Sequence, residues 1–243
     1  MSYYVEIYMR LARMLRKPVD EVRVKMKKVI IFGNGDFARS MWYYITTDTD
    51  WELCGFTVEA EYLSDATFQG LPLINFDTIT DEYPSSEYEI VLGVGYRKMN
   101  TIRQRIFLEC KQKGYRISRF IHSTALVQTD DVGEGTIILE RVVVLPFTSI
   151  GLGNVIYSGT QIAHDNTIGD FNLIAGVTST CGFVTIKNNC FLGNRCMVMD
   201  GVTLHDYALV GAGANVNKDM MPYEVMVPAR GIILENKKST DFI

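Results

Sequence analysis

The chain has 243 residues, 47% of them hydrophobic, and a formal net charge of −4. This length allows one large or two modest domains with a sizeable core, and the acidic balance argues against a nucleic-acid-binding surface. The chain has no apolar run long enough for a membrane span, and residues 1–16 lack the apolar centre of a secretory signal. The five cysteines form no CxxC pair, which is typical of free thiols in a reducing cytoplasm. We therefore expect a cytoplasmic protein.

Residues 1–25 are expected to form a helical extension, because their apolar residues follow helical spacing with arginines elsewhere on the helix. Residues 26–119 predict a nucleotide-binding α/β domain, in which strands alternate with helices and form a small parallel sheet. The predicted strands are 27–33, 53–58 and 89–93, and the predicted helices are 36–44 and 99–113. About three strands make only half of the fold that holds a dinucleotide.

The predicted nucleotide site lies in the turn after the first strand. Residues 33–38 read G-N-G-D-F-A, a match to G-x-G-x-x-A, and Glu59 ends the next strand. In this Rossmann fingerprint the glycines let backbone N–H groups approach a diphosphate, and the acid holds a ribose hydroxyl. The literal interpretation is an NAD-dependent dehydrogenase; another is a tight turn without a ligand. Because the domain has room for one mononucleotide unit, we predict a site for a single nucleotide.

From residue 126 to residue 216 an aliphatic residue falls on nearly every sixth position. No α-helix or flat sheet keeps a period of six, so the pattern predicts a parallel β-helix over 120–231. Three repeats make one coil, and residues eighteen apart should stack at the strand spacing of ~4.8 Å. The repeat positions, with Thr180 as the exception, are Leu126, Val132, Ile138, Val144, Ile150, Ile156, Ile162, Ile168, Ile174, Thr180, Ile186, Leu192, Val198, Leu204, Val210 and Val216. The positions four after them are uncharged and small or medium-sized, as the narrow corner of a prism requires; they are Thr136, Val142, Thr148, Asn154, Thr160, Asn166, Asn172, Thr178, Val184, Cys190, Cys196, Val202, Ala208 and Ala214.

His164 is the candidate general base for an acyl transfer, which needs a group with a pKa near neutral. It lies two positions after Ile162, at an exposed corner, and Gly182 lies one coil further along the same edge. Gly182 would present an unobstructed backbone N–H to a carbonyl oxygen, and Asp165 would orient the imidazole and stabilise its protonated form. The alternative is a solvated histidine without a role.

The other two histidines, His122 and His205, are expected to have no catalytic role. A zinc site of the γ-class carbonic anhydrase kind needs histidines that stack along an edge or face one another across a subunit boundary. The separations between His122, His164 and His205 are not multiples of eighteen, and no Cys/His cluster supports them. We therefore predict no metal.

The combination of a small nucleotide-binding α/β domain with hexapeptide coils resembles the bacterial nucleotide-sugar N-acetyltransferases and the sialic-acid O-acetyltransferase-like family around them. The resemblance covers about residues 26–230. The matching segments are VIIFGNGDFAR (29–39), VGYRKMNTIR (94–103), FIHSTALV (120–127), IAHDNTIGDF (162–171), VGAGANVNKDM (210–220) and VPAR (227–230). It implies a left-handed β-helix, a homotrimer with active sites between subunits, and acetyl-CoA in the groove between two subunits.

The resemblance also implies roles for individual residues. It makes His164 the base that takes a proton from the sugar amine, Asp165 the acid that holds it, and Gly182 the donor to the thioester carbonyl. The candidate nucleotide-sugar contacts are Gly33, Asn34, Gly35, Asp36, Glu59, Gly93 and Arg97. The candidate acetyl-CoA contacts are Gly182, Asp200, Gly201, Lys218 and Arg230, ahead of a C-terminal tail over 232–243. The acidic pair that often ends the family's second strand is replaced by 57–59, TVE.

We expect an acetyl-CoA-dependent N-acetyltransferase that acts on a nucleotide-linked amino sugar in the biosynthesis of surface glycans such as lipopolysaccharide O-antigen. The expected acceptor is the 4-amino group of a UDP- or dTDP-linked 4-amino-4,6-dideoxyhexose. An O-acetyltransferase for a sialic acid or another sugar hydroxyl would use the same apparatus. A trimer that binds the nucleotide sugar without catalysis is the non-enzymatic alternative.

Overall fold

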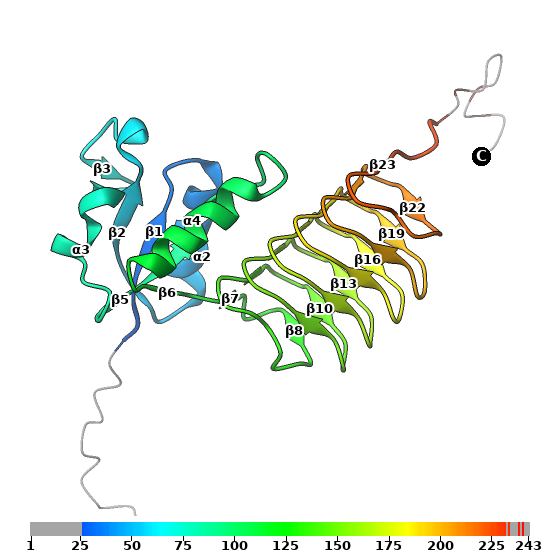
Figure 1. Cartoon of the computed structure of the whole chain (residues 1–243), viewed down its shortest axis with the longest axis horizontal. Coiled ribbons are helices and arrows are strands. Elements are labelled where there is room, and N and C mark those ends of the chain that lie inside the picture. Colours follow the sequence, from blue (N-terminus) through cyan, green and yellow to red (C-terminus); the bar gives the residue numbers. More distant parts are fainter. Residues whose placement is uncertain (1–25, 232, 234–237, 239, 241–243) are drawn as a thin grey trace, which may run out of the picture.

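The computed structural model describes residues 26–231, 233, 238 and 240. The predicted N-terminal helix and most of the predicted tail lie outside the described residues. An α/β domain is followed by a stack of coils that extends away from it (Figure 1). None of the described helices is both long enough and apolar enough to cross a membrane.

The α/β domain contains one sheet of six strands, where the sequence predicts about three. Its strands are β1 (Lys28–Phe32), β2 (Glu52–Val58), β3 (Thr67–Phe68), β4 (Leu71–Asn75), β5 (Tyr88–Leu92) and β6 (Arg116–Ile117). Their order is β3-β4-β2-β1-β5-β6, and only β3 runs antiparallel to its neighbour. The prediction was wrong because β3 and β6 have two residues each and β4 contains Pro72, so none carries the pattern that marks a strand.

The order of the parallel strands creates a switch point beside β1, because β2 and β4 lie on one side of β1 while β5 and β6 lie on the other. In open parallel sheets, ligands bind at the carboxyl ends of the strands at such a point. The loops that follow β1 and β5 meet there, since a Cβ at Gly33 would stand only 2.7 Å from the carbonyl oxygen of Gly93. With five parallel strands, the domain is larger than the single mononucleotide unit predicted from its length.

Helices cover both faces of this sheet. The helices are α2 (Asp36–Asp48), η1 (Ala60–Tyr62), η2 (Phe76–Thr78), α3 (Ile79–Glu82) and α4 (Thr101–Gln112). Helix α2 packs Ala38, Met41 and Ile45 on one face, and α4 packs Ile106 and Phe107 on the other. Helix α4 begins at Thr101, later than predicted. Residues 98–100 have positive φ, a left-handed conformation that cannot belong to a right-handed helix.

The coils form three parallel sheets, as the period of six predicts. The first contains β8 (Leu126–Val127), β10 (Val143–Val144), β13 (Gln161–Ile162), β16 (Ser179–Thr180), β19 (Met197–Val198) and β22 (Asn215–Val216). The second contains β11 (Ser149–Ile150), β14 (Thr167–Ile168), β17 (Thr185–Ile186) and β20 (Thr203–Leu204). The third contains β7 (Phe120–Ile121), β9 (Ile137–Ile138), β12 (Val155–Ile156), β15 (Leu173–Ile174), β18 (Phe191–Leu192), β21 (Leu209–Val210) and β23 (Val225–Met226). This arrangement fits a left-handed parallel β-helix.

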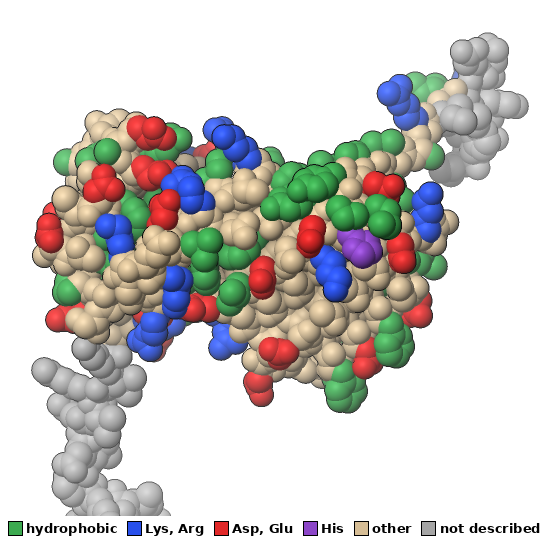
Figure 2. All heavy atoms as spheres, in the orientation of Figure 1, with side chains coloured by type: hydrophobic (Ala, Val, Ile, Leu, Met, Phe, Trp, Pro, Cys, Tyr) green, Lys and Arg blue, Asp and Glu red, His purple; other side chains and the backbone are tan. Residues whose placement is uncertain are grey.

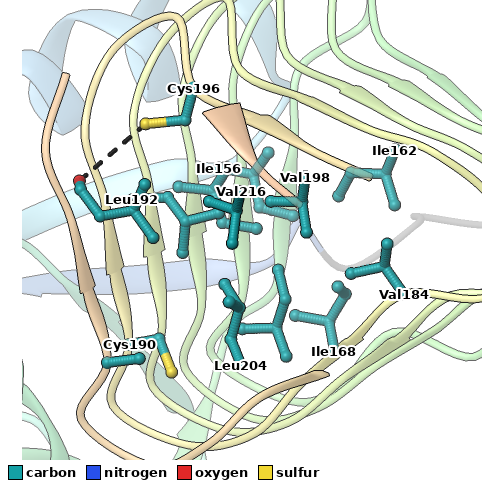
Figure 3. Close-up of a cluster of buried hydrophobic side chains, with 14 of the residues drawn as sticks. Ile156, Ile162, Ile168, Val184, Cys190, Leu192, Cys196, Val198, Leu204 and Val216 are labelled. Atoms are coloured by element: carbon teal, nitrogen blue, oxygen red, sulfur yellow. Dashed lines mark hydrogen bonds between the residues drawn. The ribbon is translucent and has the colours of Figure 1, made fainter. Parts of the chain in front are cut away.

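The interior of the β-helix is filled by the predicted residues. Ile162, Val198, Val216 and their equivalents point to one another inside the coils (Figure 3), and the repeat positions from Val132 to Val216 are buried. The fourteen positions four residues after them are buried as well. Burial of this apolar column stabilises the fold by about 25 cal/mol per Å² removed from water.

Leu126 is the exception, because it is 54% exposed and Val127 packs on the core in its place. The pairing of Val127 with Val144 moves the first coil one residue out of phase. The next interior residue, Val132, follows only five positions after Val127, and its own pairing with Ile150 restores the repeat. A one-residue slip exchanges the two faces of a strand, so the expected inward orientation of Leu126 was wrong.

Candidate active site

The candidate catalytic residues lie on one edge of the β-helix. His164 follows β13, Gly182 follows β16 and Asp200 follows β19, and these strands pair in the first sheet with Ile162 opposite Thr180 and Thr180 opposite Val198. The edge therefore separates the first sheet from the second. The structure brings together the three residues that the spacing of eighteen predicts to be neighbours.

The imidazole of His164 is held by the next residue. Its Nδ1 lies 2.8 Å from Oδ2 of Asp165, and both side chains remain partly exposed. Asp165 has φ of 56°, a left-handed conformation that acids adopt more readily than most residues. An Nδ1–H that donates to this carboxylate leaves Nε2 as the proton acceptor, which is the arrangement that a general base needs.

Gly182 lies directly under this imidazole. A Cβ at Gly182 would stand 2.8 Å from Cε1 and 3.2 Å from Nε2 of His164, and 3.1 Å from Oδ1 of Asp200. Among the described residues, no acceptor is hydrogen-bonded to the Gly182 N–H. A proton acceptor and a free backbone donor therefore adjoin each other, which is the geometry that stabilises an oxyanion beside a base.

Two exposed phenylalanines flank His164 along the same edge, and no role for them follows from the sequence pattern alone. Phe147 is 82% and Phe183 is 58% exposed, and both have positive φ. The ring of Phe183 meets the imidazole edge to face, with centroids 5.4 Å apart. On the face shown in Figure 2, hydrophobic side chains gather along the coils while acidic and basic side chains are interspersed.

Gly33 and Gly93 form the floor of the predicted nucleotide site. Gly33 has φ of 122°, and a Cβ there would stand 2.7 Å from the carbonyl oxygen of Gly93, so a larger residue would push the two loops apart. Gly35, by contrast, has open space around its α-carbon. Asn34 donates from Nδ2 to the carbonyl of Tyr62, which joins this loop to η1.

The remaining nucleotide-site candidates are not all gathered at the switch point. Arg97 is exposed in the loop after β5, and the largely exposed Asp36 pairs with Arg39. The carboxylate of Glu59 forms a two-pronged ion pair with Arg105, at 2.8 and 3.0 Å. Glu59 therefore already has a partner where the sequence predicts a contact with ribose. The ion pair could not be predicted, because Arg105 lies 46 residues from Glu59 along the chain.

A cavity of about 680 Å³ opens beside this ion pair at the carboxyl ends of β2 and β4. Its walls carry Glu59, Phe76, Asp77, Arg105 and Lys113. The cavity is polar and charged, and it lies on the side of the sheet that α4 covers. It is separate from the edge that holds His164.

The acetyl-CoA candidates other than Gly182 are exposed. Asp200 and Gly201 follow β19, Lys218 follows β22, and Arg230 lies beyond the last strand. Gly201 donates its N–H to the carbonyl of Gly182 at 3.0 Å, which continues the edge by one coil. Asp200, Gly201 and Lys218 therefore continue the edge of His164, whereas Arg230 follows a strand of the third sheet.

Arg103 joins the α/β domain to the coils, and sequence reasoning missed it. Its fully buried guanidinium donates to the carbonyls of Gly153 and Asn172 at 2.9 and 3.1 Å, and more distantly to Gly95 and Phe171. Burial lowers the pKa of Arg103 to about 10. The periodicity of α4 could have found it, because Arg103 lies on the helical face that also carries Ile106, Phe107 and Cys110.

The two other histidines have structural surroundings. His122 packs edge to face on Tyr44, with Nε2 at 3.7 Å from Asp48, and its Nδ1 accepts the N–H of Thr124. His205 uses its backbone in the ladder between coils. Across residues 26–231, no group of three or more His, Cys, Asp or Glu side chains is arranged to hold a metal.

All five cysteines are free thiols, as predicted. Cys190 lies inside the β-helix, where burial raises its pKa to about 12. Burial raises the pKa of Cys110 and Cys196 as well. These thiols stay protonated near neutral pH, so they are packing groups and not nucleophiles.

The fold and the site define a class, the proteins that join an α/β domain to a hexapeptide-repeat β-helix. Residues 183–218 match the family described as bacterial transferase hexapeptide (six repeats). An acyl-[acyl-carrier-protein]–UDP-N-acetylglucosamine O-acyltransferase of Agrobacterium fabrum is 28% identical over 86 residues, which are 35% of this chain and 32% of that protein. The chain thus spans about a third of the length of this relative.

Two solved structures share the fold over most of their length. PerB from Caulobacter crescentus, in complex with CoA and GDP-perosamine, has a TM-score of 0.71 at 22% identity and covers 82% of this chain and 93% of its own. The acetyltransferase domain of PglB from Neisseria gonorrhoeae, in complex with acetyl coenzyme A, has a TM-score of 0.71 at 19% identity and covers 85% and 100%. At these identities the likeness establishes the fold, which this chain shares with acetyltransferases.

Proposed function

We propose that the protein is an acetyl-CoA-dependent N-acetyltransferase that acts on an amino sugar linked to a nucleoside diphosphate. The observation that carries the proposal is the His164–Asp165 pair above the free N–H of Gly182 on one edge of a hexapeptide β-helix. PerB, which shares this fold, was crystallised with CoA and GDP-perosamine, and the PglB domain with acetyl coenzyme A. These three ligands fit the proposed chemistry.

The reaction follows from the geometry of the edge. Asp165 holds Nδ1–H of His164, so Nε2 takes the proton of the sugar amine as its nitrogen attacks the thioester carbonyl carbon. The N–H of Gly182 donates to the oxyanion of the tetrahedral intermediate. When the carbon–sulfur bond breaks, the proton returns from His164 to the CoA thiolate, and the products are the amide and free CoA thiol.

The active site is proposed to lie between subunits of a homotrimer. The α/β domain packs on the third sheet through Ile137 and Val155, and on the edge between the second and third sheets through Phe171. His164 lies on the edge between the first and second sheets, away from this junction. An amino sugar held at Gly33 and Gly93 would therefore meet the His164 of a neighbouring copy. Light scattering of the full chain checks the trimer.

The acceptor is proposed to be the 4-amino group of a 4-amino-4,6-dideoxyhexose, used in the cytoplasm for surface-glycan biosynthesis. The test is the release of CoA thiol from acetyl-CoA in the presence of UDP-, dTDP- and GDP-linked amino sugars, each beside its hydroxyl counterpart. Thiol release with an amino sugar alone supports the proposal and names the nucleotide. Release only with hydroxyl acceptors would assign O-acetylation instead. Binding of the sugar without thiol release would leave a non-enzymatic trimer.

A further inference from the structure

One repeat position of the β-helix is unlike all the others. The repeat positions carry aliphatic residues except Thr180, which is 6% exposed and lies in β16, one coil beyond His164. A hydroxyl among aliphatic side chains is costly unless it is hydrogen-bonded. Its partner here is the backbone N–H of Ala163, which donates to Oγ1 of Thr180 at 3.1 Å.

The same contact interrupts the ladder between coils. At equivalent positions on this sheet, the N–H after the interior residue donates to a backbone carbonyl of the next coil, as Leu145 does to Ile162 and Met199 does to Val216. Ala163 instead donates to the side chain of Thr180. Ala163 immediately precedes His164, so the exception in the sequence and the exception in the ladder coincide beside the candidate base.

We propose that Thr180 is a positioning residue, whose hydroxyl sets the path of the backbone at Ala163 and thereby the place of the His164 imidazole above Gly182. The proposal rests on the proposed function for its effect on catalysis. A base must lie within hydrogen-bond reach of the attacking amine, and a misplacement of about 1 Å can cost up to ~100-fold in rate. Asp165 holds one ring nitrogen and Phe183 meets the imidazole edge to face, yet the side chain of His164 remains 50% exposed.

The test is Thr180→Val, which keeps the shape, completes the aliphatic column and allows the ordinary ladder bond. Its thermal unfolding midpoint should equal or exceed that of the wild type, while kcat falls about 10- to 100-fold and KM for acetyl-CoA stays unchanged. Thr180→Ser keeps the hydroxyl and should recover most of kcat, although it loses a buried methyl group. Thr178→Val is the matched control, because it removes a buried hydroxyl that donates to Gly193 on another edge.

A second readout does not depend on turnover. The chain has three histidines, so their ring signals in carbon–proton NMR spectra are assigned by removing each in turn. Thr180→Val should shift the signals of His164 and leave those of His122 and His205 in place, and Thr180→Ser should preserve all three. Unchanged His164 signals, or a Thr180→Val variant with wild-type kcat, would overturn the positioning role. A wild type without acetyl transfer would contradict the proposed function alone, since the NMR comparison still decides the role of Thr180.

Discussion

The imidazole of His164 packs over the α-carbon of Gly182, which lies one coil further along the same edge of the β-helix. A Cβ at Gly182 would stand 2.8 Å from Cε1 of His164, closer than real carbon atoms approach. The repeat thus sets the proposed base and the proposed backbone donor next to each other, and glycine is the residue that leaves room for both. The stacking of coils, more than any single loop, creates this arrangement.

Gly182→Ala should lower kcat by about 10- to 100-fold, because the new methyl group displaces the imidazole from the amine. KM for acetyl-CoA should change little. The control is Gly176→Ala on another edge, where the tightest contact of a Cβ is 3.2 Å from the carbonyl of Ser158. Steady-state kinetics with the best acceptor of the sugar panel measure both. Equal activity of the two variants would mean that Gly182 serves packing alone.

Phe183→Asn should lower kcat by about three- to tenfold. Loss of the aromatic contact with His164 would reduce the population of the correctly placed imidazole by about that factor. Phe183 has φ of 58°, a conformation that asparagine tolerates better, so stability should not fall. Val177→Asn is the matched control, because Val177 has the same φ and the same 58% exposure on another edge. Wild-type kcat in Phe183→Asn would show that the contact with His164 is incidental.

Arg103→Met should destabilise the chain by about 2–3 kcal/mol, since it leaves the buried carbonyl of Gly153 without a donor and that of Asn172 with the N–H of Val155 alone. Arg105→Met, two residues along α4, removes a half-exposed ion pair and should cost about 1 kcal/mol or less. Urea unfolding of both variants provides the comparison. Similar losses would contradict the assignment of Arg103 as the link between the domains.

The carboxylate of Glu89 should make stability depend on acid pH. Burial acts to raise its pKa, but the hydroxyl of Ser118 and the charges of Lys27 and Arg116 outweigh this and hold the pKa below its ordinary value. A lowered folded pKa means that the stabilisation is present above the unfolded pKa of ~4.3 and is lost as the pH falls through the folded value.

Glu89→Gln should therefore be less stable than the wild type near neutral pH, and the gap should narrow as the pH falls from ~5 to ~3. Urea unfolding at a series of pH values measures this gap. Glu87→Gln, at an exposed position nearby, should show no such convergence. A gap between wild type and Glu89→Gln that is constant with pH would contradict the linkage.

The period of six predicted the coils, because each repeat places its aliphatic residue inside and every coil meets only its neighbours. Ile162 and Val198 could be assigned to the core from their positions in the six-residue repeat alone. Leu126 could not, since its orientation depends on a turn that is one residue short, and turn length sets register at the ends of the column. The short strands β3 and β6 escaped prediction for the related reason that two residues carry no periodicity.

Part of the candidate site could likewise be predicted from the sequence, and part could not. The stacking of His164 and Gly182 follows from the spacing of eighteen, and their roles stay predictions. Contacts between distant segments could not be read from the chain, as the ion pair of Glu59 with Arg105 and the bonds from Arg103 to Gly153 and Asn172 illustrate. Both depend on how α4 lies against its surroundings, and an arginine on a helix is usually solvated.

The most direct test of the central claim compares wild type and His164→Ala for release of CoA thiol from acetyl-CoA with a nucleotide-linked amino sugar. Loss of a general base costs about 10²–10⁴-fold in rate. We expect a fall in kcat of that size for His164→Ala, with the affinity for acetyl-CoA unchanged. Full activity of His164→Ala would contradict the assignment of His164 as the base and the acetyl-transfer mechanism built on it.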